Sequence, residues 1–117
     1  MSRTESEHRI DYVEFPATDL EATKRFFHTV FGWTFQDWGP SYAAFDDGRM
    51  AGGFRAAEAV APGGPLVILY AADLEATRDA VSEAGGTVVE DIFAFPGGRR
   101  FHFADPNGNV LAVWSDA

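Results

Sequence analysis

Apolar and polar residues alternate roughly over residues 10–15, a stretch rich in β-forming residues, and this pattern predicts a first strand. Thr18 then predicts a helix N-cap, with Glu21 three positions later as the second half of a capping box. Apolar residues follow at helical spacing, and Gly32 predicts a left-handed end to the helix. The apolar face of this helix comprises Leu20, Phe26, Phe27, Val30 and Phe31.

Short strands and turns fill the rest of the first half. Turn-forming residues at Asp46-Asp47-Gly48 separate the last two strands of this half. Gly and Pro then gather in a segment that predicts a linker, over about residues 57–65. The three strands are expected near residues 33–37, 41–46 and 49–55.

The first helix has a near-copy later in the chain. The residues Asp19–Lys24 recur as Asp73–Arg78, at an offset of 54 positions. A strand is expected before the second helix, three strands after it, and a hairpin turn at residues 105–109. Two similar halves of this kind predict one α+β domain over residues 1–117, in which each half has the order βαβββ. We place module one at about residues 9–56 and module two at about residues 66–115. In module two we expect strands near 66–71, 87–91, 99–104 and 109–115 and a helix from Asp73 to about Ala84.

Composition narrows the classes of protein that remain. Hydrophobic residues make up 46% of the 117 positions, which is enough for a buried core. There is no cysteine, so thiolate metal sites and disulfides are excluded. No apolar run approaches a membrane span and the N-terminus has no secretory pattern, so we expect a cytoplasmic protein with no membrane partner. The net charge of −9 disfavours nucleic acid as a partner and favours a cationic small molecule. The alternative is that this charge only keeps the protein soluble.

Two motifs connect the chain to a known family. One is the segment Asp19–Phe27 followed by Phe31-Gly32-Trp33, and the other is the closing sequence Phe103–Leu111, which contains Asp-Pro-Asn-Gly-Asn. Together, in a duplicated chain, they resemble the vicinal oxygen chelate superfamily of glyoxalases, bleomycin-resistance proteins and dioxygenases. The resemblance implies an open, U-shaped, barrel-like sheet with the helices outside, and a homodimer. It also implies that enzymes of the family hold a divalent metal with four side chains, which come from the first and last strands of each module.

The motif spacing of the family carries those four positions onto this chain as Tyr12, Gly52, Leu66 and Ala112. Leu, Ala and Gly side chains have no lone pair to donate, and Tyr is an uncommon ligand for the divalent ions concerned. We therefore expect no metal and no other cofactor. The resemblance then points to the members that bind small molecules without metal, as bleomycin-resistance proteins do.

Alternation along the strands, combined with the family geometry, selects the side chains that line the cavity. We expect an aromatic or cationic small molecule as the ligand. Glu14 and His102 are candidate catalytic acid–base groups, and the alternatives are a Glu14 that is solvated or paired with Arg100 and a His102 that is simply hydrogen-bonded in the sheet. Arg100 either clamps an anionic group or is a surface charge, and Trp114 and Tyr12 either stack on the ligand or belong to the core. The candidate ligand-binding residues are Tyr12, Trp38, Tyr42, Tyr70, Arg100 and Trp114.

Two functional hypotheses follow. The first is a metal-free module that sequesters a small molecule. The second is a lyase or isomerase that uses Glu14 and His102 for acid–base chemistry, or an atypical metal site. Loss of turnover on changing Glu14 or His102 would distinguish the second from the first.

Overall fold

The computed structural model describes residues 7–61 and 63–117, and it forms eight strands and two helices within them. Parts of the N-terminal segment and of the predicted linker therefore lie outside the described residues. The first module contains β1 (Tyr12–Ala17), α1 (Leu20–Phe31), β2 (Thr34–Asp37), β3 (Tyr42–Asp46) and β4 (Ala51–Ala56). The second contains β5 (Val67–Tyr70), α2 (Leu74–Glu83), β6 (Thr87–Phe95), β7 (Gly98–Ala104) and β8 (Val110–Ser115).

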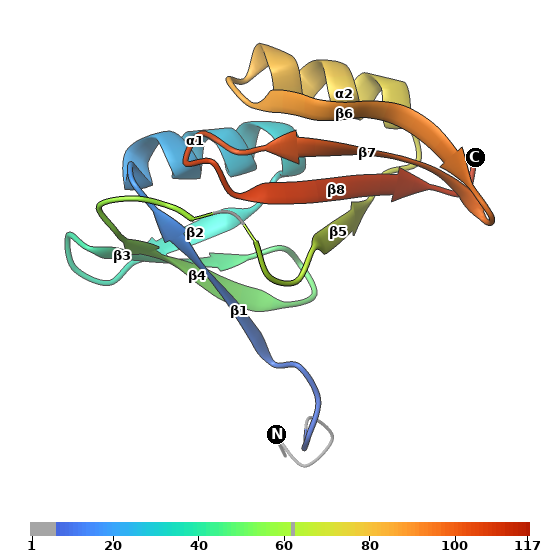
Figure 1. Cartoon of the computed structure of the whole chain (residues 1–117). Coiled ribbons are helices and arrows are strands. Elements are labelled where there is room, and N and C mark those ends of the chain that lie inside the picture. The colour runs from blue at the N-terminus through green and yellow to red at the C-terminus, as the bar shows by residue number, and fades with distance from the viewer. Residues whose placement is uncertain (1–6, 62) are drawn as a thin grey trace.

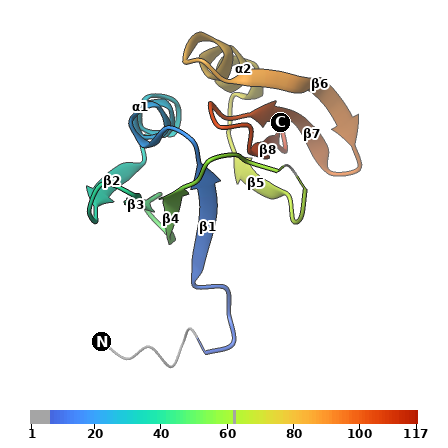
Figure 2. The same ribbon diagram turned by 60° about the vertical axis from the view of Figure 1, so that its left-hand side comes forward.

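Each module folds into its own four-stranded mixed sheet. The first sheet has the order β1-β4-β3-β2 and the second has the matching order β5-β8-β7-β6. The first strand of each module pairs in parallel with the last strand, and the remaining pairs are antiparallel. The predicted α+β class and the duplicated βαβββ order are confirmed, and the two sheets stay open rather than closing into a barrel (Figures 1 and 2).

The two helices begin in the same way. Asp19 is the N-cap of α1, and its side chain accepts a hydrogen bond from the Ala22 amide; the prediction of Thr18 as the cap was one residue early. Asp73, where the second helix was predicted to begin, caps α2 identically through the Ala76 amide. A carboxylate stabilises the N-terminus of a helix better than a hydroxyl, because its negative charge also interacts favourably with the positive end of the helix dipole. Gly32 ends α1 with a φ of 74°, in the left-handed region that was expected.

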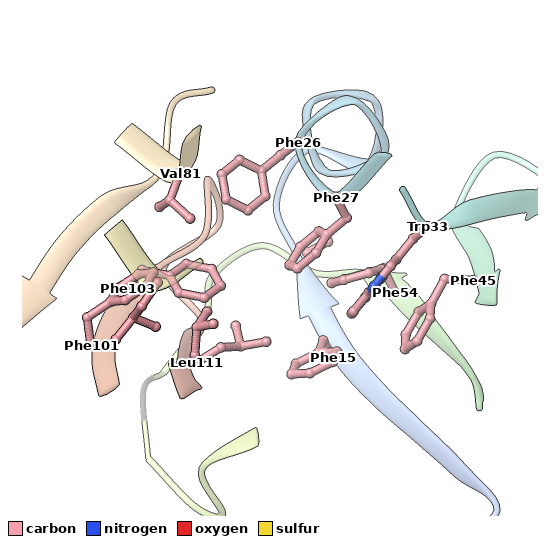
Figure 3. Close-up of a cluster of buried hydrophobic side chains, with 13 residues drawn as sticks. Phe15, Phe26, Phe27, Trp33, Phe45, Phe54, Val81, Phe101, Phe103 and Leu111 are labelled. Carbon is pink, nitrogen blue, oxygen red and sulfur yellow. The ribbon is translucent and has the colours of Figure 1, made fainter. Parts of the chain in front are cut away.

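A single hydrophobic core lies between the helices and both sheets. Phe26 and Phe27 of α1 point to different sides, and Figure 3 shows Phe26 toward the second module and Phe27 toward the first. The ring centroids of Phe26 and Phe103 are 6.0 Å apart, and those of Phe27 and Phe54 are 5.2 Å apart. Side chains of α1 thus pack into the cores of both modules and join them into one unit.

The predicted hairpin turn after β7 does more than reverse the chain. Asn107, at its tip, accepts hydrogen bonds from the backbone N–H groups of Thr18 and Asp19, at 2.8 and 3.2 Å, and donates one to Thr23. Asn109 donates to the carbonyl of Pro16 at 2.8 Å. The turn of the second module therefore satisfies free donors at the start of α1, in the first module. We name residues 105–109 the clamp turn.

Buried Asp105 organises the clamp turn from within. It accepts hydrogen bonds from the backbone N–H groups of Asn107 and Asn109 and from both of their amide side chains. Burial raises the pKa of this carboxyl group, while these hydrogen bonds act in the opposite direction. Within the described residues, no helix has the length and apolar character required to cross a membrane.

Candidate functional site

Each sheet has one face against the helices and one face without a covering layer (Figure 2). We name the second the open face. Side chains alternate along a strand, so buried Phe15, Phe54 and Phe101 mark the helix side and their neighbours mark the open face. The open face of the first sheet carries Tyr12, Glu14, Tyr42, Gly53 and Arg55, and that of the second carries Ile68, Tyr70, Phe93, Arg100, His102, Ala112 and Trp114.

Three of the predicted residues form one hydrogen-bonded chain on the first sheet. The Tyr42 hydroxyl donates to Glu14 Oε2 at 3.0 Å and lies 2.7 Å from the Tyr12 hydroxyl. Because Tyr42 has a single hydroxyl proton, Tyr12 must be the donor to Tyr42. Burial, followed by these two hydrogen bonds, raises the pKa of Tyr42 well above its usual value. Tyr42 therefore stays protonated at neutral pH, and the hydrogen bonds run from Tyr12 through Tyr42 to the carboxylate.

Glu14 has an ionic partner that the sequence did not suggest. Arg55 Nε lies 3.5 Å from Glu14 Oε1. The expected alternative partner, Arg100, is on the other sheet. Arg55 and Glu14 are brought together because β4 pairs in parallel with β1. Local sequence motifs do not indicate this pairing.

The pairing of strands corrects one of the four positions derived from the family. Phe15 pairs with Phe54, and the equivalent residue Leu69 pairs with Val113, so Gly53, not Gly52, corresponds to Ala112. A Cβ on Gly52 would collide with the Phe45 ring and the Val13 carbonyl, on the helix side. The prediction of Gly52 was wrong by one residue because it was counted from the turns, and the loops of the two modules differ in length.

Gly53 makes room for the tyrosine pair. A Cβ built on Gly53 would overlap the Tyr42 hydroxyl and lie 2.6 Å from the hydroxyl oxygen of Tyr12. The absence of a side chain at this position is therefore required by the hydrogen-bonded chain. The tyrosine hydroxyls occupy the space into which a side chain from β4 would project.

A different group of predicted residues meets on the second sheet. Arg100 pairs in register with Trp114 on β8 and with Phe93 on β6, so the three lie side by side. The Trp114 ring is 5.3 Å from the Tyr70 ring and 6.4 Å from the Phe95 ring. His102, two residues along β7, lies 5.8 Å from the Phe93 ring. Sequence reasoning missed Phe93 and Phe95, because the strand expected near residues 87–91 in fact continues to Phe95.

The two candidate catalytic groups belong to different modules. Glu14 lies on β1 in the first sheet and His102 on β7 in the second. Trp38 also stands apart, since 67% of its surface is exposed and only its backbone N–H bonds to Tyr42, through the carbonyl of that residue. Trp33, which lies five residues earlier, is buried in the core against Phe27 and Phe45.

A cleft of about 420 Å³ lies where the two modules meet. Its walls come from β1, from the start of β5 with the segment before it, and from the start of β8. Glu14 is the one predicted ligand-contacting or catalytic residue in these walls, and most of the others are apolar. The described lining residues are Val13, Glu14, Phe15, Pro16, Ala61, Gly63, Gly64, Pro65, Leu66, Val67, Asn109 and Val110.

Fold and sequence together identify the family. The model of the Glyoxalase/Bleomycin resistance protein/Dioxygenase superfamily matches residues 9–113, so the chain belongs to this superfamily. A glyoxylase-like domain-containing protein from Didymella fabae is 28% identical over 121 residues, which cover 90% of this chain and 91% of that protein.

Solved structures share the fold at low sequence identity. A glyoxalase/bleomycin resistance protein/dioxygenase family enzyme from Burkholderia phytofirmans has a TM-score of 0.81 at 19% identity, with 92% of this chain and all of that chain covered. A glyoxalase-related enzyme from Fulvimarina pelagi gives 0.79 at 20% identity, covering 92% of this chain and 88% of that one. The fosfomycin resistance protein FosX from Mesorhizobium loti gives 0.78 at 16% identity, covering 92% of each chain.

The four positions that the family resemblance assigns to a divalent metal do not suit one here. After the correction they are Tyr12, Gly53, Leu66 and Ala112, of which only Tyr12 has a donor atom, and its hydroxyl is engaged with Tyr42. No group of three His, Asp or Glu side chains within residues 7–61 and 63–117 is arranged to hold a metal ion elsewhere. We derive no chemistry through a metal at these positions.

Proposed function

We propose that this protein binds a small organic molecule in the cleft between the modules and does so without the divalent metal of the family's enzymes. The observation that carries the proposal is the cleft itself, with the carboxylate of Glu14 in an otherwise mainly apolar wall. Its volume of about 420 Å³ falls within the range of roughly 300–1,000 Å³ usual for small-molecule sites.

The chemistry of the walls supports an apolar ligand with a cationic group. Valine, leucine, proline and phenylalanine side chains supply the apolar surface. Glu14 receives one hydrogen bond from Tyr42 and one ionic contact from Arg55, so its oxygens keep lone pairs for another donor. A protonated amine would be held more strongly than a neutral group, because charge-assisted hydrogen bonds are about twice as strong.

Calorimetric titration with 1-naphthylmethylamine tests the proposal, with the uncharged 1-naphthalenemethanol as the matched probe. We expect saturable binding of the amine at one site, with at least tenfold weaker binding of the alcohol. Glu14→Gln should remove most of this difference, and Leu66→Trp should block both probes by filling the cleft. Glu83→Gln, on α2, removes an equal charge outside the cleft and serves as the control.

Absence of saturable binding by either probe would count against the cleft as a site. Equal effects of Glu14→Gln and Glu83→Gln would show that only the overall charge matters. Elemental analysis after incubation with Zn²⁺, Ni²⁺, Mn²⁺ and Fe²⁺ tests the other half of the proposal. We expect less than stoichiometric metal, and one tightly bound ion per chain would overturn the metal-free assignment.

We also propose that the protein forms a homodimer. The strands β1 and β5 are both at the edge of a sheet. Several large apolar side chains in and beside these strands are exposed to solvent. Ile10 is 79% exposed, and Tyr12, Ile68 and Tyr70 are each about half exposed. Open edges and apolar patches of this kind favour association. Sedimentation equilibrium should give twice the mass of the chain, and a monomer at all concentrations would contradict the proposal.

A further inference from the structure

The open face of the second sheet carries a charged group that the proposed cleft does not use. Arg100 lies in the middle of this face, between its register partners Phe93 and Trp114. The cleft reaches β8 only at its first residue, Val110, next to Asn109 in the turn before it. Trp114 is four residues further along the strand, which corresponds to about 13 Å at the usual rise per residue. The two places are therefore separate.

The guanidinium group of Arg100 is held against aromatic rings. Its central carbon lies 5.3 Å from the centroid of the Phe93 ring and 5.5 Å from that of the Phe95 ring. Contacts of this kind orient an arginine without neutralising it, since the rings carry no net charge. The positive charge therefore remains available to an anion.

The adjacent arginine shows what Arg100 lacks. Arg99 points to the opposite side of β7 and forms two hydrogen bonds, of 2.5 and 3.2 Å, with the carboxylate of Glu75 on α2. Within the part of the chain that the structure describes, Arg100 has no carboxylate partner. Two neighbours in the sequence thus differ in whether their charge is matched.

Two buried nitrogen atoms of Arg100 and His102 also lack hydrogen-bond partners. Nε of Arg100 and Nε2 of His102 are buried and have no hydrogen-bond partner among the described residues. Buried polar atoms in native proteins usually have a partner, and Arg100 Nε can only donate, so an acceptor is missing on this face. Phe93 lies beside both side chains: its ring centroid is 5.3 Å from the central guanidinium carbon of Arg100 and 5.8 Å from the His102 ring centroid.

We propose that this face is a second binding site, which takes the carboxylate of a planar aromatic acid. The carboxylate would pair with the Arg100 guanidinium, whose fork of donors matches two carboxylate oxygens. The aromatic ring would pack against Trp114 and its neighbour Tyr70. Nothing in this arrangement requires the cleft to be occupied.

The surroundings select an acid with a single negative charge. Glu90 is the register partner of His102, and Asp116 accepts a hydrogen bond of 2.9 Å from the Tyr70 hydroxyl. These carboxylates lie at two sides of the site and would repel a second negative charge. A monocarboxylate therefore fits better than a dicarboxylate or a phosphate ester.

Isothermal titration calorimetry with 2-naphthoate tests this site, with 2-naphthamide as an uncharged probe of the same shape. We expect one molecule of 2-naphthoate per chain and at least tenfold weaker binding of the amide. Arg100→Leu should weaken 2-naphthoate binding at least tenfold, and Arg100→Lys should keep part of it, since it retains the charge but not the fork. Circular dichroism shows whether each variant is folded.

The control variant is Arg49→Leu, which removes an equal charge from the turn before β4. Leu66→Trp separates the two sites: it should block the amine probe in the cleft and leave 2-naphthoate binding unchanged. The proposal is overturned by unchanged binding in Arg100→Leu, by equal loss in Arg49→Leu, or by loss in Leu66→Trp. It is also overturned if Arg100→Leu converts a dimer to a monomer, because the missing acceptor would then belong to a second copy.

Discussion

The open faces of the two sheets share a backbone plan and differ in how far their polar groups are satisfied. On the first, Tyr12, Tyr42, Glu14 and Arg55 form a connected set in which each polar group has a partner. On the second, Arg100 and His102 each keep a buried nitrogen without one. The strand order and the parallel pairing of first and last strands are identical.

This difference shows that the duplicated fold sets where equivalent residues lie on the two sheets, while the residue type at each position differs between the modules. Glu14 pairs with Gly53 on the first sheet, and the equivalent pair on the second is Ile68 and Ala112. A carboxylate beside a glycine in one module thus corresponds to two apolar residues in the other. Each face can therefore serve a different ligand, or one can be structural while the other binds.

The largest expected effect tests which face each glycine of β4 occupies. We expect Gly52→Ala to lower the free energy of unfolding by about 2–3 kcal/mol, because the new methyl group would meet the backbone of β1 as well as Phe45. Gly53→Ala should cost about 1 kcal/mol, since the ends of the two tyrosine side chains can move aside at the loss of a hydrogen bond. Urea unfolding measures both, and a larger effect for Gly53→Ala would reverse our assignment of the faces.

A second experiment loosens the connection between the modules. Asn107→Ala should lower the free energy of unfolding by about 2 kcal/mol, because it leaves two N–H groups at the start of α1 without their acceptor. We expect a single cooperative transition to remain, since α1 still supplies the core of both modules. Gln36→Ala, which removes an exposed amide, is the control. An effect of Asn107→Ala no larger than that of the control would show that the clamp turn does not join the modules.

The two faces can be compared directly through a matched pair of tyrosines. Tyr42→Phe removes the hydroxyl that connects Tyr12 to Glu14, and we expect a loss of about 1 kcal/mol. Tyr70→Phe removes a hydroxyl that donates to Asp116 at the protein surface, so we expect a loss below about 0.5 kcal/mol. Similar losses in urea unfolding would mean that the first face is no better organised than the second.

The smallest effect concerns the contrast between Arg99 and Arg100. The hydrogen bond from Arg99 lowers the pKa of Glu75 to about 2, from an ordinary value of 4.5. A lowered pKa means that the ion pair stabilises the fold fully above pH 4.5 and that this contribution is lost as the pH falls through about 2. The melting temperature of Glu75→Gln should therefore lie below that of the wild type at pH 7, and the two should converge near pH 2. A constant difference across this range would contradict the ion pair.

Much of the fold could be predicted from local patterns. The position of Gly32, the cap at Asp73 and the order of strands follow from spacing and residue type, and the structure confirms them. The site was only partly predictable, because register depends on pairs that are far apart in the sequence. Gly53, Arg55 and Phe93 were missed for this reason: each is defined by its partner on another strand.

The sequence by itself determined the α+β class and the duplicated βαβββ order, because those features depend on repeat spacing and residue type. Only the tertiary structure decided on which of the two sheets each candidate residue lies. It grouped Tyr12, Glu14 and Tyr42 on one sheet and Tyr70, Arg100, His102 and Trp114 on the other. The physical reason is that strand pairing and the packing of α1 between the modules fix which side chains meet, and neither is encoded in any short stretch of the chain.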